Sequence, residues 1–101
     1  MRRRLIVSPK AEADIIEAAL WYDQREAGLG WDFTSEIGIA IGRAVQNPFH
    51  HLQLRKSPDL RSVLAARFPY RIFFIVRAEE IVILAILHAA RHDSHWQRRI
   101  V

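Results

Sequence analysis

The stretch Ile81 to Leu87, IVILAIL, places seven apolar residues in a row, four of them β-branched. A short run that is apolar at every position is typical of a strand that is covered on both faces. The preceding stretch Tyr70 to Arg77, YRIFFIVR, is rich in aromatic and β-branched residues and predicts a second strand. Only residues 78 to 80 separate the two stretches. We therefore predict an antiparallel hairpin at the centre of a sheet.

The alternation within the strand at 70–77 assigns its side chains to two faces. One face carries Tyr70, Ile72, Phe74 and Val76, and the other carries Arg71, Phe73, Ile75 and Arg77. Both arginines lie near an end of the strand, where they can reach solvent.

Two helices are predicted before this hairpin. Ser8 and Pro9 mark the start of the first, because serine accepts hydrogen bonds from the free N–H groups of a helix start and proline has no N–H to leave unpaired. We expect this helix to run to about Glu26 and a second to run from about Leu29 to Gln46, where Asn47-Pro48 stops it. A short apolar run at 5–7 predicts a first or edge strand.

Gly38 and Gly42 lie four residues apart in the second predicted helix. A glycine inside a helix costs about 1 kcal/mol relative to alanine. We expect these two positions to allow a close approach of the alanine-rich first helix.

The remaining segments have weaker patterns. Residues 48 to 60 show no clear period and predict a loop with one turn of structure, whereas residues 61 to 68 are a candidate strand. Residues 93 to 99 predict a short last helical turn, with Trp96 packed onto the sheet. The order predicts a single α+β domain over residues 1–101, in which a helical hairpin packs on one face of a mostly antiparallel sheet of three to four strands.

The composition favours a soluble, cytoplasmic protein. There is no cysteine, so a disulfide framework and a cysteine-ligated metal are both excluded. No apolar run approaches the roughly 20 residues that span a bilayer. The start MRRRLIVSPK has only three apolar residues after its charges, too few for a signal peptide.

The basic residues are unevenly placed. Residues 1 to 46 carry six Lys/Arg against seven Asp/Glu, whereas residues 47 to 101 carry nine against four. Thirteen of the fifteen basic residues are arginine, whose planar fork suits carboxylates and phosphates. We therefore expect the second part of the chain to meet an anionic partner, which is RNA, DNA or an acidic protein segment.

The segment that follows the last strand, HAARHD at 88–93, is the candidate for chemistry. His88 continues the alternation of Val82, Leu84 and Ile86, so the simpler interpretation is a hydrogen-bonded histidine at the sheet edge. Arg91 and Asp93 make an ordinary surface pair in that interpretation. His50-His51 has no third ligand nearby in the sequence, and we expect no metal and no cofactor.

Several of these segments resemble the ParE/RelE superfamily of type II toxin–antitoxin toxins, which includes plasmid stabilisation proteins. The similar parts are SPKAEADI at the first helix, PYRIFFIV, the short acidic turn, IVILAILHAARHD and the late Trp96. The resemblance implies a toxin that a cognate antitoxin holds inactive. ParE-like members poison DNA gyrase by protein binding, and RelE-like members cut mRNA on the ribosome without a metal.

Metal-free RNA cleavage needs a base, an acid and a cation beside the phosphate. The resemblance to RelE-like nucleases implies Arg71, His88 and Arg91 for these roles. However, there is no tyrosine after Tyr70, so the C-terminal tyrosine of such nucleases is absent.

The sequence therefore favours a ParE-like toxin that arrests growth by binding DNA gyrase. The predicted target-binding residues are Arg61, Arg67, Arg71, Arg77, His88 and Arg91. The predicted partner is an antitoxin with an acidic, amphipathic helical tail, whose apolar face lies along the helical hairpin or the sheet edge and whose carboxylates meet the arginines. The alternatives are a ribosome-dependent mRNA endonuclease and a non-toxic module that only binds an antitoxin.

Overall fold

The computed structural model describes residues 3–90 and 97–99 of the chain. The elements in chain order are β1 (Arg4–Val7), α1 (Pro9–Arg25), α2 (Leu29–Gln46), the 3₁₀ turn η1 (Pro48–His50), β2 (Leu52–Arg55), β3 (Asp59–Leu64), β4 (Tyr70–Val76), β5 (Glu80–His88) and the 3₁₀ turn η2 (Gln97–Arg99). Of the predicted last turn, residues 97 to 99 are therefore helical, whereas Trp96 lies outside the described residues.

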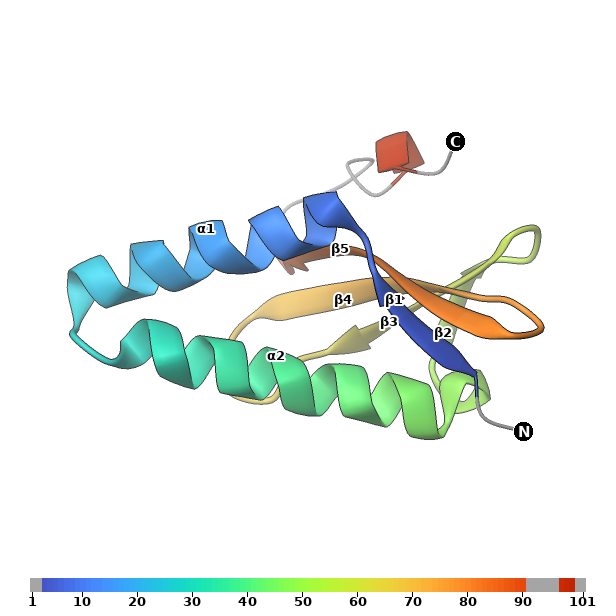
Figure 1. Cartoon of the computed structure of the whole chain (residues 1–101), viewed down its shortest axis with the longest axis horizontal. Coiled ribbons are helices and arrows are strands. Elements are labelled where there is room, and N and C mark those ends of the chain that lie inside the picture. Colours follow the sequence, from blue (N-terminus) through green and yellow to red (C-terminus); the bar gives the residue numbers. More distant parts are fainter. Residues whose placement is uncertain (1–2, 91–96, 100–101) are drawn as a thin grey trace.

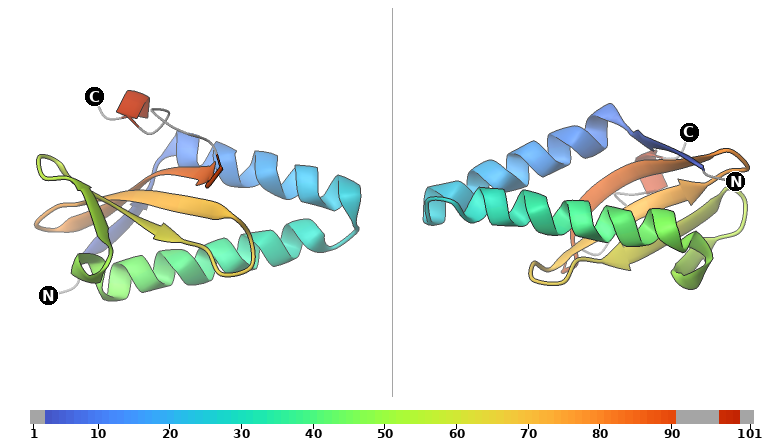
Figure 2. Two further views of the ribbon diagram at one scale, coloured as in Figure 1. Left: turned by 180° about the vertical axis from the view of Figure 1, so that it is seen from behind. Right: turned by 60° about the horizontal axis from the view of Figure 1, so that its bottom comes forward.

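The five strands form one sheet in the order β1-β5-β4-β3-β2. β1 runs parallel to β5, and the other neighbours are antiparallel. Figure 1 shows α1 and α2 side by side as an antiparallel pair over one face of this sheet, and Figure 2 shows the opposite face without a helix. The predicted α+β fold and the central β4–β5 hairpin are confirmed.

The number of strands and one boundary were predicted wrongly. β2 lies inside the predicted loop at 48–60, and β3 covers Asp59–Leu64 instead of 61–68. All four residues of β2 are exposed because it is an edge strand that lies away from the helices. Its sequence, Leu52-Gln53-Leu54-Arg55, alternates apolar and polar residues over only four positions, too few to distinguish it from the surrounding loop.

Both helix starts and ends follow local chemistry. The Ser8 hydroxyl accepts the Ala11 N–H at 3.1 Å, and Pro9 occupies the first position of α1. Between the helices Gly28 adopts a φ of 90°, a conformation that glycine enters without strain. α2 ends at Gln46, as predicted from Asn47-Pro48.

The close approach of the two helices occurs at Gly30 and not at the predicted glycines. A Cβ atom at Gly30 would overlap the Ala19 carbonyl oxygen, whereas one at Gly38 or Gly42 would meet no atom within 4 Å. The Gly30 N–H also donates to the Asp23 carboxylate at 2.7 Å. The expectation for Gly38 and Gly42 is wrong because both lie on the solvent side of α2.

The main core lies between the helices and the sheet. Its largest fully buried side chains are Phe33 and Ile37 of α2 with Ile72, Phe74, Ile81, Ile83 and Ile86 of the two central strands. The rings of Tyr22, Phe33, Phe68 and Tyr70 pack together at one end of it. The opposite sheet face holds two small apolar groups, Leu60, Ile75 and Leu84 in one and Phe73, Ala85 and Leu87 in the other.

A β-bulge in β5 decides where its last residues point. Phe73 pairs with Ala85 and Phe74 pairs with Ile83, so Leu84 is an extra residue between them. An extra residue moves all later side chains to the other face. The predicted alternation of His88 with Val82 and Leu84 is therefore wrong: those two lie on the uncovered face, whereas His88 shares the helix side with Ile86.

Candidate interaction surface

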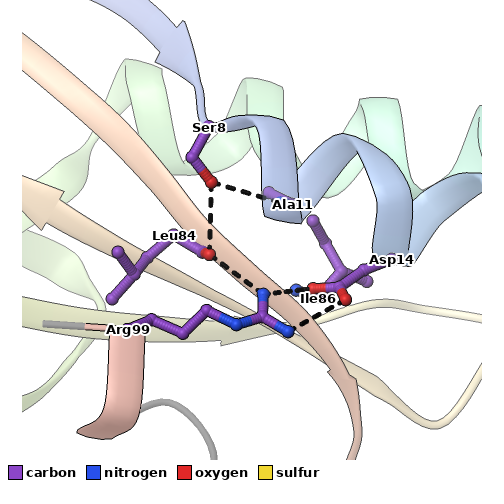
Figure 3. A network of polar contacts seen from close by, with 6 residues as sticks. All are labelled: Ser8, Ala11, Asp14, Leu84, Ile86 and Arg99. Carbon is purple, nitrogen blue, oxygen red and sulfur yellow. Dashed lines mark hydrogen bonds and ion pairs between the residues drawn. The ribbon is translucent and has the colours of Figure 1, made fainter.

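The second half of β5 has no strand beside it on the β1 side within the described ranges. The pairing of β1 ends where Val7 meets Ile83, and α1 then turns across the strand. Side chains take over the role of the missing neighbour, as Figure 3 shows. The Leu84 carbonyl accepts the Ser8 hydroxyl at 3.3 Å, and the Ile86 N–H donates to Asp14 Oδ2 at 2.9 Å.

Arg99 closes this network from the C-terminal side. Its guanidinium donates to both Asp14 oxygens, at 2.7 and 3.1 Å, and to the Leu84 carbonyl at 3.3 Å. Both side chains are less than one fifth exposed. The hydrogen bond that Arg99 donates to Asp14 raises the pKa of Arg99, and partial burial opposes this. Asp14 thus joins α1, β5 and the C-terminal turn, a contact over 85 residues that no local pattern predicts.

A pocket of about 730 Å³ lies beside this network, between α1 and the end of β5. Its aromatic and apolar lining comes from Trp21, Tyr22, Tyr70, Ile86 and Leu87, and its polar lining from Lys10, Asp14, Glu17, His88, Arg98 and Arg99. A cavity of this size holds a few side chains of a partner protein. Sequence reasoning missed this group of ionisable side chains, because α1, β5 and η2 each contribute only a few of them.

His88 lies in this pocket with its ring against Tyr70, the ring centroids being 5.2 Å apart. Its Nδ1 accepts the Ala90 backbone N–H at 3.1 Å. A backbone N–H can only donate, so the neutral imidazole carries its proton on Nε2. His88 in this form offers a hydrogen-bond donor to the pocket and not a base.

Arg71 lies on the other side of the sheet from His88. Tyr70 pairs with His88 and Arg71 pairs with Leu87, and successive side chains of a strand point to opposite faces. Arg71 instead donates to the buried Ser62 hydroxyl at 3.2 Å. The two candidate catalytic residues therefore point to opposite faces of the sheet.

Comparison with known proteins decides the family. The family model described as "ParE toxin of type II toxin-antitoxin system, parDE" matches residues 5–93.

The chain belongs to this ParE toxin family.

A solved structure described as "Chromosomal ParDE TA system from P. aeruginosa" is similar to this ParE-family chain with a TM-score of 0.76. Their sequences are 21% identical, and the alignment covers 86% of this chain and 96% of the other. This likeness supports the fold. A search of curated proteins found no match. In addition, none of the helices formed by the described residues has the length and hydropathy needed to cross a membrane.

Arg61 of this ParE-family chain has an internal role. Its side chain is 13% exposed, and its guanidinium binds the Asp59 carboxylate at 3.0 Å. It also donates to the Phe49 and His51 carbonyls, at 3.3 and 3.0 Å. These bonds fasten η1 and the start of β2 to β3, so little of Arg61 remains for a partner.

The other predicted target-binding residues are dispersed: Arg67 lies in the loop between β3 and β4, Arg71 lies in β4 and Arg77 directly follows it. Arg67 is more than half exposed and lies 3.9 Å from Asp32, and Arg77 is equally exposed and lies 3.4 Å from Glu80. Arg71 and Arg77 flank opposite ends of β4, so they do not form one cluster. Arg91 lies outside the described residues. Across residues 3–90 and 97–99, no three His, Asp or Glu side chains gather as a metal site would require.

Proposed function

We propose that this chain is the toxin of a type II toxin–antitoxin module and that it arrests growth by binding DNA gyrase. The family match over residues 5–93 carries the proposal. A cognate antitoxin holds the toxin inactive, and both proteins are located in the cytoplasm.

The placement of the candidate residues favours binding over turnover. Arg71 and His88 point to opposite sheet faces, and Nδ1 of His88 is already occupied by the Ala90 N–H. A phosphodiester-cleaving site needs its base, acid and cation around one phosphate. Exposed arginines along a sheet instead suit contact with an acidic protein surface.

The charge distribution supports an acidic antitoxin segment on the sheet. Outside the helical hairpin the chain carries twelve Lys/Arg against four Asp/Glu. Arg55 is the last residue of β2, Lys56 begins the exposed turn to β3, and Arg71 lies on the uncovered face. The carboxylates of the antitoxin meet these residues, and rim contacts of this kind raise the association rate and select the partner.

A supercoiling assay with purified gyrase tests the target. We expect excess toxin to inhibit supercoiling and the variant Arg71→Glu to inhibit less. Arg43→Glu is the matched control because it makes the same charge change on the helical hairpin, where Arg43 makes one exposed bond to the Leu64 carbonyl. Full supercoiling in the presence of excess wild-type toxin would rule out gyrase.

A second candidate function is ribosome-dependent mRNA cleavage, as in RelE-like toxins. The observation in its favour is that Tyr70, His88, Lys10 and Arg98 line one pocket. Mapping of mRNA 5′ ends after toxin expression tests it, with His88→Ala as the variant that removes the donor. New 5′ ends that disappear in this variant would establish cleavage, whereas expression without growth arrest would favour a module that only binds an antitoxin.

A further inference from the structure

The helical hairpin and the rest of the chain carry opposite charge. Residues 9 to 46 contain three basic residues, Lys10, Arg25 and Arg43, against seven acidic ones, a balance of −4. The chain as a whole has a net charge of +4. An acidic antitoxin segment therefore does not suit the hairpin, which is one of the two places predicted for it from the sequence.

The side of the hairpin that faces away from the sheet exposes large apolar side chains. Ile16 and Leu20 of α1 are each 59% exposed, Trp31 of α2 is 76% exposed and Ile39 is 57% exposed. The core-facing positions, such as Ala11 and Ala18 of α1 and Phe33 and Ile37 of α2, lie on the opposite sides of their helices. Single exposed apolar residues are common, but several large ones on one side of a helical hairpin indicate an interaction site.

Acidic residues lie beside the exposed apolar pair of α1. Glu12, Ile16, Leu20 and Asp23 follow one another at intervals of three and four residues, so they form one stripe along the helix. All four are exposed, and so is Glu17, which lies next to Ile16. Glu12 and Glu17 form no ion pair with any described residue. The stripe is thus an apolar centre with acidic ends.

The neighbouring surface of α2 has two positions without a side chain. Gly38 and Gly42 lie on its solvent side, where no atom lies within 4 Å of an added Cβ. The two helices are of nearly equal length, 17 and 18 residues, so the hairpin presents a surface about 25 Å long. This length fits a helix of a partner that lies along it, with apolar anchors at spacings of three and four residues.

We propose that the outer face of the helical hairpin is a second docking surface, for a basic amphipathic helix of a partner protein. The apolar face of this helix covers Ile16, Leu20 and Trp31. Its Lys or Arg residues meet Glu12, Glu17 and Asp23. The affinity comes mainly from apolar burial, since exposed ion pairs contribute only about 0–1 kcal/mol each. The charges select a basic partner here and an acidic one on the sheet.

Two synthetic helical peptides serve as probes. Both carry the same leucine stripe, but one has lysines and the other glutamates on its polar face. We expect the lysine peptide to bind the full chain at least about tenfold more tightly in a calorimetric titration, because 1.4 kcal/mol corresponds to this factor. Its binding is expected to shift the amide NMR signals of Ile16, Leu20 and Gly38.

Variants separate this surface from the sheet. The double variant Ile16→Ser/Leu20→Ser is expected to weaken binding of the lysine peptide about tenfold. The double variant Glu12→Lys/Glu17→Lys is expected to reverse the preference between the peptides. Arg55→Glu/Lys56→Glu changes the charge at the end of β2 by the same magnitude with the opposite sign. It is expected to leave the binding site of the lysine peptide unchanged and its affinity within about twofold.

Three results would overturn the proposal. The first is equal affinity for both peptides, and the second is a set of shifted signals confined to the sheet. The third is a concentration-dependent dimer in light scattering that Ile16→Ser/Leu20→Ser abolishes, because the face would then belong to a second copy of the chain. None of these results bears on gyrase inhibition, so the two proposals stand or fall separately.

Discussion

Replacement of Asp14 by alanine is expected to destabilise the fold more than any other change to an acidic residue of α1. Asp14 accepts three hydrogen bonds, one from the Ile86 N–H and two from the Arg99 guanidinium. A bond to a charged group is worth about 1.5–3 kcal/mol, and breaking a buried pair costs about 3–5 kcal/mol. The side chains of Asp14 and Arg99 are 15% and 18% exposed, so the pair is not fully buried. We therefore expect the free energy of unfolding to fall by about 3 kcal/mol, the lower end of this range.

Urea and thermal unfolding followed by circular dichroism measure this loss. For a domain of this size about 1 kcal/mol lowers the Tm by 4–8 °C, so we expect a decrease of roughly 12–24 °C. Asp14→Asn keeps an acceptor for the Ile86 N–H and is expected to lose about half as much. Glu17→Ala, one turn along and exposed, is the control. If Asp14→Ala is no more destabilising than Glu17→Ala, the network does not close the edge of β5.

Three further changes test the fold and its electrostatics. Gly30→Ala is expected to destabilise the fold because its Cβ would overlap the Ala19 carbonyl oxygen of α1. Gly38→Ala is expected to stabilise the fold by about 1 kcal/mol. Urea midpoints measure both changes. Ser8→Ala is expected to cost about 1 kcal/mol in the same assay, because the cap of α1 is lost. The hydrogen bond from Arg4 lowers the pKa of Glu80 below its ordinary 4.5, and Arg77 lowers it further. Partial desolvation opposes both effects. The contribution of Glu80 to stability is therefore present above that ordinary value and is lost as the pH falls through the lowered pKa. An NMR titration of the Glu80 carboxyl is expected to give a higher midpoint in Arg4→Ala than in the wild type.

The sequence predicted those elements whose residues carry a periodic pattern or a local stop signal. The β4–β5 hairpin follows from two apolar runs and a short turn, and both helices follow from their periodic pattern with Ser8-Pro9 and Asn47-Pro48 as start and stop signals. β2 escaped prediction because it is an exposed edge strand of only four residues, too short for its alternation to stand out from a loop. No single-residue signal marked the bulge at Leu84.

The candidate site was less predictable than the fold, because it depends on which face each strand residue occupies. One extra residue in β5 moves His88 to the helix side and separates it from Arg71. Similarly, the arginines of the sequence do not reveal that the guanidinium of Arg61 donates hydrogen bonds to carbonyl groups of η1 and of the residue before β2. The pairing of Asp14 with Arg99 joins residues that only the folded chain brings together.

The parallel pairing of β1 with β5 also has a consequence for the order of folding. Arg4 and Glu80, which begin this pairing, lie 76 residues apart, whereas β4 and β5 are separated only by residues 77 to 79. A hairpin closes in about 1–10 μs, but pairing of distant segments must first overcome the entropy of a long loop. We therefore expect the β4–β5 hairpin to form early and β1 to join the sheet last. By the same reasoning β1 is the first strand to detach, and its amide hydrogens are expected to exchange with solvent faster than those of the central hairpin.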